Sequence, residues 1–325
     1  MAKQQPNIIL GCASFGSPED PTTKTHTPAQ AALLFDVLTS YGHTTIDTSR
    51  RYPPTKPGTS EEVIGGTLSS TENASLTSKL VIDTKVLSAP GCHKPENIAK
   101  SIADSLNALG VSSVHTIYLH FPDRTQPLTN PISALSHAVS NGQAQQWGIS
   151  NYTLDDVRAI LSWCKEHGWI PPAVFQGEYN PLNRAAESEL IPFLHENGIA
   201  FYAYSPGAGG AIAPTGSRIT AKGPAGDRVR QLYGGEEMQS AIQKVRDAVD
   251  AAGLNGHEAA IRWTVWNGSL DGRYGDGVIV GASSESQLRE TLEAIKRGGL
   301  SDHVRDVVGS IWSDVQNSQA QKAQG

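Results

Sequence analysis

The chain has 325 residues, of which 38 % are hydrophobic and 18 % are charged, and its formal net charge is −6 at pH 7. This length permits a large core, in either one barrel or two smaller domains. The negative charge argues against nucleic acid or an anionic membrane as the partner, although it is compatible with a local basic pocket.

Short apolar runs alternate with longer amphipathic segments from residue 7 onward. After a first strand, Thr27 is the expected N-cap of a helix and Gln30 its capping-box partner. Thr59 and Glu62 form a second expected capping box, which predicts a helix that ends near Leu68. Later segments repeat the alternation of helix and strand, and the helices often end in Asn-Gly or His-Gly just before the next apolar run. Such endings are typical of helix C-caps that lead into parallel strands.

Eight strand-helix units can be counted, which favours a closed (β/α)8 TIM barrel over an open, doubly wound sheet. No linker divides the chain, so we expect a single domain over residues 1–325. The Gly- and Pro-rich region 207–236 follows the seventh strand and is expected to be an irregular active-site loop. A last helix is expected from Ser301 to Trp312, followed by a flexible tail over residues 314–325.

Polar side chains stand at or just after the ends of three predicted strands. Asp47 interrupts a buried run, and a buried carboxylate needs a cation or full hydrogen bonding. Lys85 ends another strand and is the expected cation, and Tyr52 and His120 complete the group. An ammonium beside a phenol lowers the pKa of the phenol, so these four residues predict a proton-delivery site at the C-terminal ends of barrel strands.

The same residues resemble the catalytic tetrad of the aldo-keto reductases in order and context, with five positions from Asp47 to Tyr52 and the sequence LHFPD around His120. The chain is most similar to the branch that contains aflatoxin-aldehyde and succinic-semialdehyde reductases. The resemblance implies NAD(P)H-dependent reduction of an aldehyde or ketone, with Tyr52 as general acid assisted by Lys85, Asp47 and His120. Later segments that resemble the family are GISNY (148–152), FQGEYN (175–180), FYAYSP (201–206), EAAIRW (258–263) and GVIVGASSESQL (277–288).

These later segments imply a nicotinamide cofactor. Polar side chains can hydrogen-bond the carboxamide of the nicotinamide, and an aromatic ring can stack on its face. Glycines and a helix N-terminus can bind the phosphates. NADPH is expected, with NADH as the alternative, because Gln287 and Thr291 stand where many relatives carry Arg and Asn. The nearby Arg289 is as well explained as a surface charge. The cofactor residues that the resemblance implies are Ser150, Asn151, Gln176, Tyr204, Ser205, Gly207, Gly209, Gly281, Ser283, Ser284 and Gln287.

The substrate is expected to be a small carbonyl compound. Arg50 and Arg51 stand where relatives usually carry smaller or aromatic residues, which favours acidic or polar substrates at the entrance. The resembling branch can also use an arginine from the loop after the seventh strand, and three are candidates here. The expected substrate residues are Phe15, Arg51, Phe121 and Tyr152 at the pocket mouth, and Arg218, Arg228 and Arg230 in the loop.

Other interpretations stay open. Taken singly, Tyr52 is more often a surface loop tyrosine and His120 a strand-end histidine bonded to backbone, whereas the four residues together at this spacing favour the catalytic interpretation. A cofactor-binding regulatory subunit of the channel β-subunit type can retain the tetrad. A phosphate-binding barrel lyase or isomerase leaves the later segments without a role. The three separated cysteines and the absence of a long apolar run predict a cytoplasmic protein without a disulfide framework, metal site or membrane span. A monomer or homodimer is expected.

Overall fold

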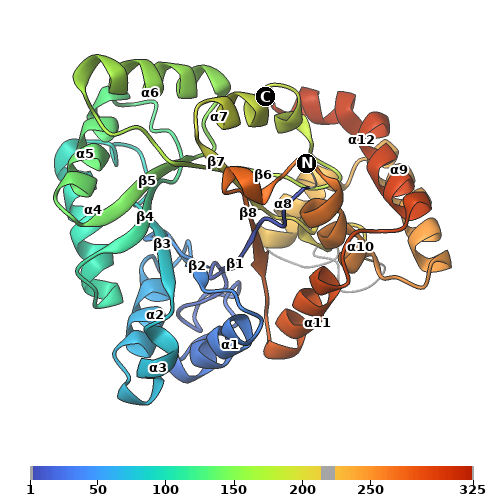
Figure 1. Ribbon diagram of the computed structural model, residues 1–325, viewed down its shortest axis with the longest axis horizontal. Coiled ribbons are helices and arrows are strands. Elements are labelled where there is room, and N and C mark those ends of the chain that lie inside the picture. Colours follow the sequence, from blue (N-terminus) through green and yellow to red (C-terminus); the bar gives the residue numbers. More distant parts are fainter. Residues whose placement is uncertain (1–2, 214–223, 324–325) are drawn as a thin grey trace.

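Eight parallel strands close into a barrel in chain order, β1 to β8, in the computed structural model, which describes residues 3–213 and 224–323 (Figure 1). The prediction of a (β/α)8 barrel is confirmed. The barrel closes where Asn7 to Gly11 pair in parallel with Gly277 to Gly281. The strands are β1 Asn7–Gly11, β2 Thr45–Asp47, β3 Val81–Lys85, β4 Val114–Leu119, β5 Ala144–Ser150, β6 Val174–Glu178, β7 Ala200–Tyr204 and β8 Gly277–Gly281.

Helices surround the barrel (Figure 1). They are α1 Pro28–Ser40, α2 Thr59–Leu68, α3 Ala74–Thr77, α4 Pro95–Leu109, α5 Thr129–Ser140, α6 Leu154–His167, α7 Leu190–Glu196, α8 Pro224–Tyr233, α9 Glu236–Ala251, α10 Gly256–Arg262, α11 Glu285–Lys296 and α12 Asp302–Ala323. Helix α12 therefore continues beyond the expected end at Trp312. The flexible tail stays a prediction.

One of the two predicted capping boxes is present. Thr27 caps α1, where its side chain accepts from the Gln30 backbone and the Gln30 side chain bonds back, so this prediction is confirmed. The box of Thr59 and Glu62 is wrong, because the N-cap of α2 is Gly58 at a left-handed φ of 90°. The Thr59 hydroxyl instead accepts from the Ser17 backbone and donates to the Lys56 carbonyl.

The segment between β7 and β8 contains more helix than the sequence predicted. Helix α8 lies within the region expected to be irregular, and α10 follows α9 before β8. The end of α8 is fixed from outside the helix. The buried Tyr233 hydroxyl donates to Glu178 Oε1 at 2.7 Å and accepts from Asn180 Nδ2 at 3.3 Å, and both partners belong to β6 or the loop after it.

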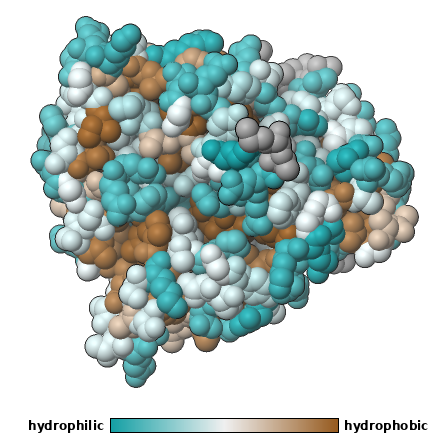
Figure 2. Space-filling view, viewed as in Figure 1, coloured by the Kyte–Doolittle hydropathy of each residue, from teal (hydrophilic) through white to brown (hydrophobic). Residues whose placement is uncertain are grey.

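Two groups of buried apolar side chains form the core. The larger group packs between the strands and the helices, and a smaller one, which includes Tyr118 and Tyr202, fills the barrel. Hydrophilic and hydrophobic areas alternate over the face in Figure 2. Among the described residues, no helix combines the length and apolar character that a membrane span requires.

Candidate active site

The candidate catalytic side chains meet at the C-terminal ends of neighbouring strands. Asp47 ends β2, Lys85 ends β3, and His120 follows β4 directly. Tyr52 lies in the loop after β2. In barrel enzymes this end of the strands carries the active site. The barrel thus brings together four residues that are up to 73 positions apart in the sequence, from Asp47 to His120.

Lys85 and Asp47 form a buried ion pair. The Lys85 ammonium donates to both Asp47 carboxylate oxygens, at 2.8 and 2.7 Å, and to the Thr48 carbonyl at 2.8 Å. All three of its protons are therefore used. Burial by itself lowers the pKa of Lys85, but the adjacent Asp47 carboxylate, together with Tyr52 and Asp83, more than offsets this, and the pKa is raised. The ammonium keeps its charge at neutral pH.

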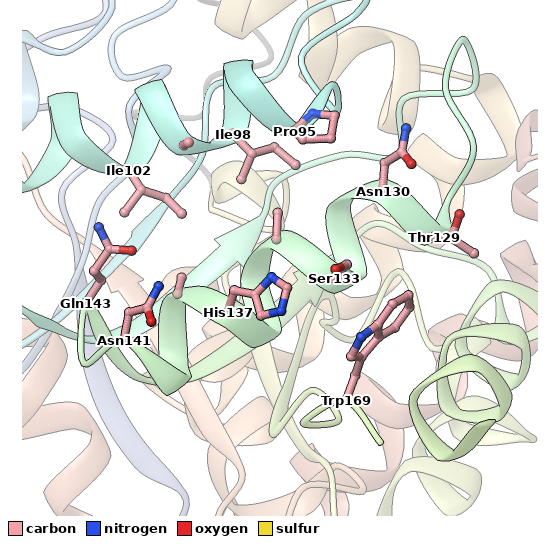
Figure 3. Close-up of a pocket in the computed structure, with 13 residues that line it drawn as sticks. Pro95, Ile98, Ile102, Thr129, Asn130, Ser133, His137, Asn141, Gln143 and Trp169 are labelled. Atoms are coloured by element: carbon pink, nitrogen blue, oxygen red, sulfur yellow. The ribbon is translucent and has the colours of Figure 1, made fainter. Parts of the chain in front are cut away.

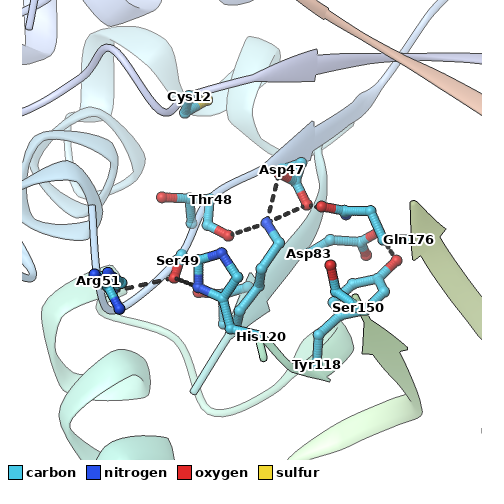
Figure 4. Close-up of polar contacts among 12 residues, drawn as sticks. Cys12, Asp47, Thr48, Ser49, Arg51, Asp83, Tyr118, His120, Ser150 and Gln176 are labelled. Carbon is cyan, nitrogen blue, oxygen red and sulfur yellow. Dashed lines mark hydrogen bonds and ion pairs between the residues drawn. The ribbon is translucent and has the colours of Figure 1, made fainter. Parts of the chain in front are cut away.

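Gln176 joins this pair from β6. Its side-chain amide donates to Asp47 Oδ1 at 2.9 Å, as Figure 4 shows. The sequence predicted Gln176 as a nicotinamide contact and did not predict this bond. Asp47 thereby has a cation on one side and a neutral donor on the other, which satisfies a carboxylate that is almost fully buried.

Tyr52 lies beside both the ion pair and the histidine. The Lys85 ammonium is 5.1 Å from the centre of the Tyr52 ring, and the His120 ring meets that ring edge-on at 5.5 Å. Burial raises the pKa of the phenol, whereas the Lys85 charge lowers it. The Lys85 charge thus acts in the expected direction, but burial outweighs it and the net pKa is raised. Tyr52 therefore holds its proton at neutral pH.

His120 is a buried, neutral imidazole. Burial and the charges of Lys85 and Arg51 place its pKa well below the usual range. Its Nδ1 lies 3.0 Å from the hydroxyl oxygen of Ser49, and its ring stacks on Phe121 with the centres 4.7 Å apart. Sequence reasoning missed Ser49, because a serine in a loop is ordinary and only the fold brings it next to a histidine 71 positions away.

Three predicted cofactor residues bond to one another at the ends of β5 and β7. Asn151, in a left-handed conformation with φ 66°, donates to the His120 carbonyl and to the Ser150 hydroxyl. The Tyr204 hydroxyl donates to Asn151 Oδ1 at 2.8 Å. This network continues directly from the catalytic group, and its side chains are those that suit a carboxamide and an aromatic ring.

The turn after β7 has an unusual backbone. Ser205 and Ala208 have φ values of 53° and 50°, in the left-handed region that residues other than glycine rarely adopt, and the φ of Gly209 is 62°. A side chain at Gly209 would come within 2.8 Å of Val229, and one at Gly207 within 3.0 Å of His257. A side chain at either of the two predicted glycines would therefore force its neighbour to move. A turn with this left-handed backbone can point its amides at a phosphate.

The turn after β8 leads into the N-terminus of α11. Gln287 Oε1 accepts from the Ser283 amide and hydroxyl at 2.7 and 2.9 Å, and Ser284 caps the helix through the Gln287 amide. Both serines and Gly281 are exposed, and no described atom lies within 4 Å of the Cβ position at Gly281. An exposed helix N-terminus beside open space fits a phosphate group. The residues around β5, β7 and β8 therefore fit a nicotinamide dinucleotide.

The expected pocket-mouth residues do not all lie at a mouth. Phe15 is fully buried and stacks on Phe35 in the core, so its expected place is wrong. Tyr152 is also buried, and its hydroxyl has no partner among the described residues. Phe121 is exposed beside His120, which agrees with a place at the mouth.

The two adjacent arginines have different environments. Arg50 is bound to the buried Glu61 carboxylate at 3.0 Å, so its charge is neutralised and it does not act at the entrance as expected. Arg51 donates to the Ser88 carbonyl at 2.8 Å, and none of its contacts among the described residues is with a carboxylate. Its charge, like that of Lys85, lowers the pKa of His120. Arg51 is therefore a cation near the site that no described carboxylate neutralises.

The loop arginines are placed only in part. Arg230 lies on α8 and forms an exposed ion pair with Asp227. Arg218 and the side chain of Arg228 lie outside the described residues. A role for any of them stays a prediction.

A separate groove of about 490 Å³ lies between α4 and α5, outside the barrel (Figure 3). Ile98 and Ile102 line one side, and His137 and Trp169 line the other. None of the residues predicted from the sequence contributes to it. The groove is thus separate from the candidate site.

Comparison with known proteins identifies the family. The model of the aldo/keto reductase family matches residues 7–312. Oxidoreductase sirO of Leptosphaeria maculans is 32 % identical over 318 residues, which cover 94 % of each chain. Aldo-keto reductase family 7 member A3 and aflatoxin B1 aldehyde reductase member 4, both of Homo sapiens, are each 32 % identical over 329 residues, which cover 96 % of this chain and 95 % of the relative. The resemblance predicted from the motifs is confirmed, and the chain belongs to the aldo/keto reductase family.

Proposed function

We propose that this oxidoreductase reduces an aldehyde or ketone to an alcohol, with NADPH as the hydride donor and Tyr52 as the general acid. Family membership supports the reaction class. The observation that carries the assignment of residues is the convergence of Tyr52, Lys85, Asp47 and His120 at one end of the barrel.

Each of these side chains has a state that suits the reaction. When bound, the reduced nicotinamide supplies a hydride to the carbonyl carbon, and negative charge then grows on the oxygen. The Tyr52 phenol still holds its proton at neutral pH and transfers it to that oxygen. The Lys85 ammonium stabilises the phenolate that remains, and Asp47 holds the ammonium in place. Neutral His120 donates a hydrogen bond to the carbonyl oxygen.

The cofactor assignment rests on side chains and backbone around β5 to β8. We assign the carboxamide to the polar residues that end β5 and β6, the ring face to Tyr204, and the phosphates to the turns after β7 and β8. We propose NADPH rather than NADH, and a cytoplasmic protein that is a monomer or homodimer. The proposed cofactor residues are Ser150, Asn151, Gln176, Tyr204, Ser205, Gly207, Gly209, Gly281, Ser283, Ser284 and Gln287.

The substrate assignment rests on Arg51 and Phe121. Arg51 has no carboxylate partner among the described residues and lies close enough to lower the pKa of His120. We therefore propose a carbonyl compound that carries an acidic or strongly polar group. The relatives named aflatoxin B1 aldehyde reductases support an aldehyde as the reacting group.

The test is turnover by the wild type and by Tyr52→Phe, followed through the absorbance of the reduced cofactor with a panel of aldehydes and ketones. We expect kcat to fall about 10²- to 10⁴-fold in Tyr52→Phe, with unchanged cofactor affinity, because only the proton donor is removed. Tyr41→Phe is the matched control, since that phenol bonds Glu293 on the exposed surface.

Two outcomes contradict the proposal in different ways. Full activity of Tyr52→Phe would show that Tyr52 is not the general acid. A wild type that binds NADPH tightly but turns over none of the panel favours the regulatory-subunit interpretation instead.

A further inference from the structure

Ser49 links the two side chains that face the reacting oxygen. It is fully buried, two positions after Asp47, and its hydroxyl oxygen lies 3.0 Å from Nδ1 of His120 (Figure 4). Its backbone carbonyl accepts from the Tyr52 amide at 2.9 Å. Ser49 therefore contacts the loop that carries the general acid through its backbone and the imidazole through its side chain.

The direction of the bond between Ser49 and His120 follows from counting protons. A serine hydroxyl has one proton to donate and two lone pairs to accept with. One lone pair is used, because the Arg51 amide donates to the Ser49 hydroxyl oxygen at 3.1 Å, and an amide can only donate. Among the described residues, His120 Nδ1 is the only group in hydrogen-bond contact with this oxygen that can accept its proton.

The opposite direction is costly. If Nδ1 carried the proton, the Ser49 hydroxyl would accept twice, and its own proton would be buried without an acceptor. A buried polar group without a partner destabilises a fold more than a typical hydrogen bond stabilises it. The hydroxyl proton therefore points to Nδ1, and Nδ1 is an acceptor.

We propose that Ser49 is a positioning residue, which holds neutral His120 as the tautomer with its proton on Nε2. A neutral imidazole carries one proton, so an Nδ1 that accepts leaves a donor at Nε2. This is the tautomer that can donate to a carbonyl oxygen as its negative charge grows. The other tautomer would direct a lone pair at that oxygen. The inference rests on the proposed function only in assigning the carbonyl oxygen as the target of Nε2.

The tautomer can be measured without substrate by ¹⁵N NMR of protein labelled at its ten histidines. His120→Gln identifies the His120 signals. At pH 7 in the wild type, we expect Nε2 to carry the proton and Nδ1 to have the chemical shift of an unprotonated nitrogen. In Ser49→Ala, we expect the two tautomers to mix. Ser60→Ala is the matched control, because it also removes a buried serine hydroxyl, one that bonds Thr48 and the Cys12 carbonyl rather than His120.

Kinetics provide the second readout. Ser49→Ala should lower kcat about twofold, because in a mixture of tautomers roughly half of the protein lacks a donor at Nε2, with cofactor affinity unchanged. Ser49→Thr retains the hydroxyl and should restore most of the loss, and Ser60→Ala should keep wild-type kcat.

The outcomes separate this inference from the proposed function. A proton on Nδ1 in the wild type overturns the role of Ser49, and so does a Ser49→Ala protein with unchanged tautomer and unchanged kcat. A wild type with its proton on Nε2 that reduces no carbonyl compound overturns the proposed function and leaves the tautomer assignment standing.

Discussion

The rim around β2 to β4, here called the first rim, and the turn after β8, here called the second rim, are built differently. In the first, buried side chains are joined across long stretches of sequence: Lys85 bonds Asp47 over 38 positions, and Gln176 bonds Asp47 over 129. In the second, the exposed Ser283 and Ser284 bond Gln287, three or four positions away. The first rim depends on the closed barrel, whereas the second depends mainly on local turns.

Because of this difference, the residues proposed for proton transfer and those proposed for cofactor binding should contribute to different free energies. The proton-transfer group is already paired and needs no ligand to fix it. The turns proposed for the cofactor expose polar groups that a phosphate can use. Changes in the first rim should therefore alter the free energy of unfolding, and changes in the second should alter cofactor affinity alone.

The largest effect is expected from Lys85→Met. Asp47 would stay buried without its cation, and breaking a buried ion pair from one side costs about 3–5 kcal/mol of unfolding free energy. The double variant Asp47→Asn/Lys85→Met should recover part of this loss, while turnover stays absent. Urea denaturation measures the free energy of unfolding of both variants.

Lys100→Met provides the matched control, because Lys100 pairs with Asp104 on the exposed surface of α4. It should change the free energy of unfolding by less than about 0.5 kcal/mol. Equal losses in Lys85→Met and Lys100→Met would remove the distinction between the first rim and an ordinary surface.

Arg51→Met tests a side chain that belongs to the first rim but is held there only weakly, by the Ser88 carbonyl. We expect KM for carboxylate-bearing aldehydes to rise about tenfold, because one charge-assisted contact is lost. KM for neutral aldehydes and the free energy of unfolding should stay near wild-type values. Arg51→Lys, which keeps the charge, should lose less. Equal KM changes for both substrate classes would exclude a charge-based preference.

Gln287→Arg moves the test to the second rim. A cation at this position would add an attraction for the 2′-phosphate, so the preference for NADPH over NADH should rise about fivefold. The unfolding midpoint without cofactor should not change, since the bonds that Gln287 forms with described residues all lie within its own turn. Dissociation constants for both cofactors measure the preference. A loss of stability would show that the second rim is also tied to the barrel.

In the first rim, the sequence predicted which residues take part better than it predicted which of them bond to one another. Asp47 and Lys85 stand out because each is a charge at the end of an apolar strand, and burial requires that they pair. The bond between Gln176 and Asp47 joins residues 129 positions apart and leaves no local signal. Phe15 was misplaced for a related reason. A loop sequence does not indicate which way a side chain points, and Phe15 turns inward, where its backbone forms a bridge with Thr25.

Helix α8 shows where local patterns fail. Its sequence, PAGDRVRQLY, has Pro and Gly among its first three residues and only a few apolar residues, so the sequence predicted a loop. The helix is fixed by contacts outside itself, through the Tyr233 hydroxyl to Glu178 and Asn180. Strand count and order were predictable because each apolar run and each Gly-ended helix is a local signal. A polar helix that is stabilised by tertiary contacts leaves no such local signal in the sequence.

The smallest effect is expected at His115, whose ring is part-exposed and bonds the buried Asp83 carboxylate at 3.1 Å. This hydrogen bond raises the pKa of His115 above its usual value near 6.5. The charged pair therefore stabilises the fold fully below about pH 6.5, and this contribution is lost as the pH rises through the folded-state pKa. The stability difference between wild type and His115→Gln should be less than about 1 kcal/mol and should shrink with rising pH.

Urea denaturation at several pH values on both sides of pH 6.5 measures this difference, and His303→Gln on the exposed face of α12 is the control. The buried ion pair of Lys85 and Asp47 should show no such loss in the same range, because the pKa of Lys85 is raised from an ordinary value that is already far above it. If the stability difference at His115 grew with rising pH instead, the pair with Asp83 would be neutral in the folded state. The contrast in pH dependence between the part-exposed pair of His115 and Asp83 and the buried pair of Lys85 and Asp47 would then have no support from His115.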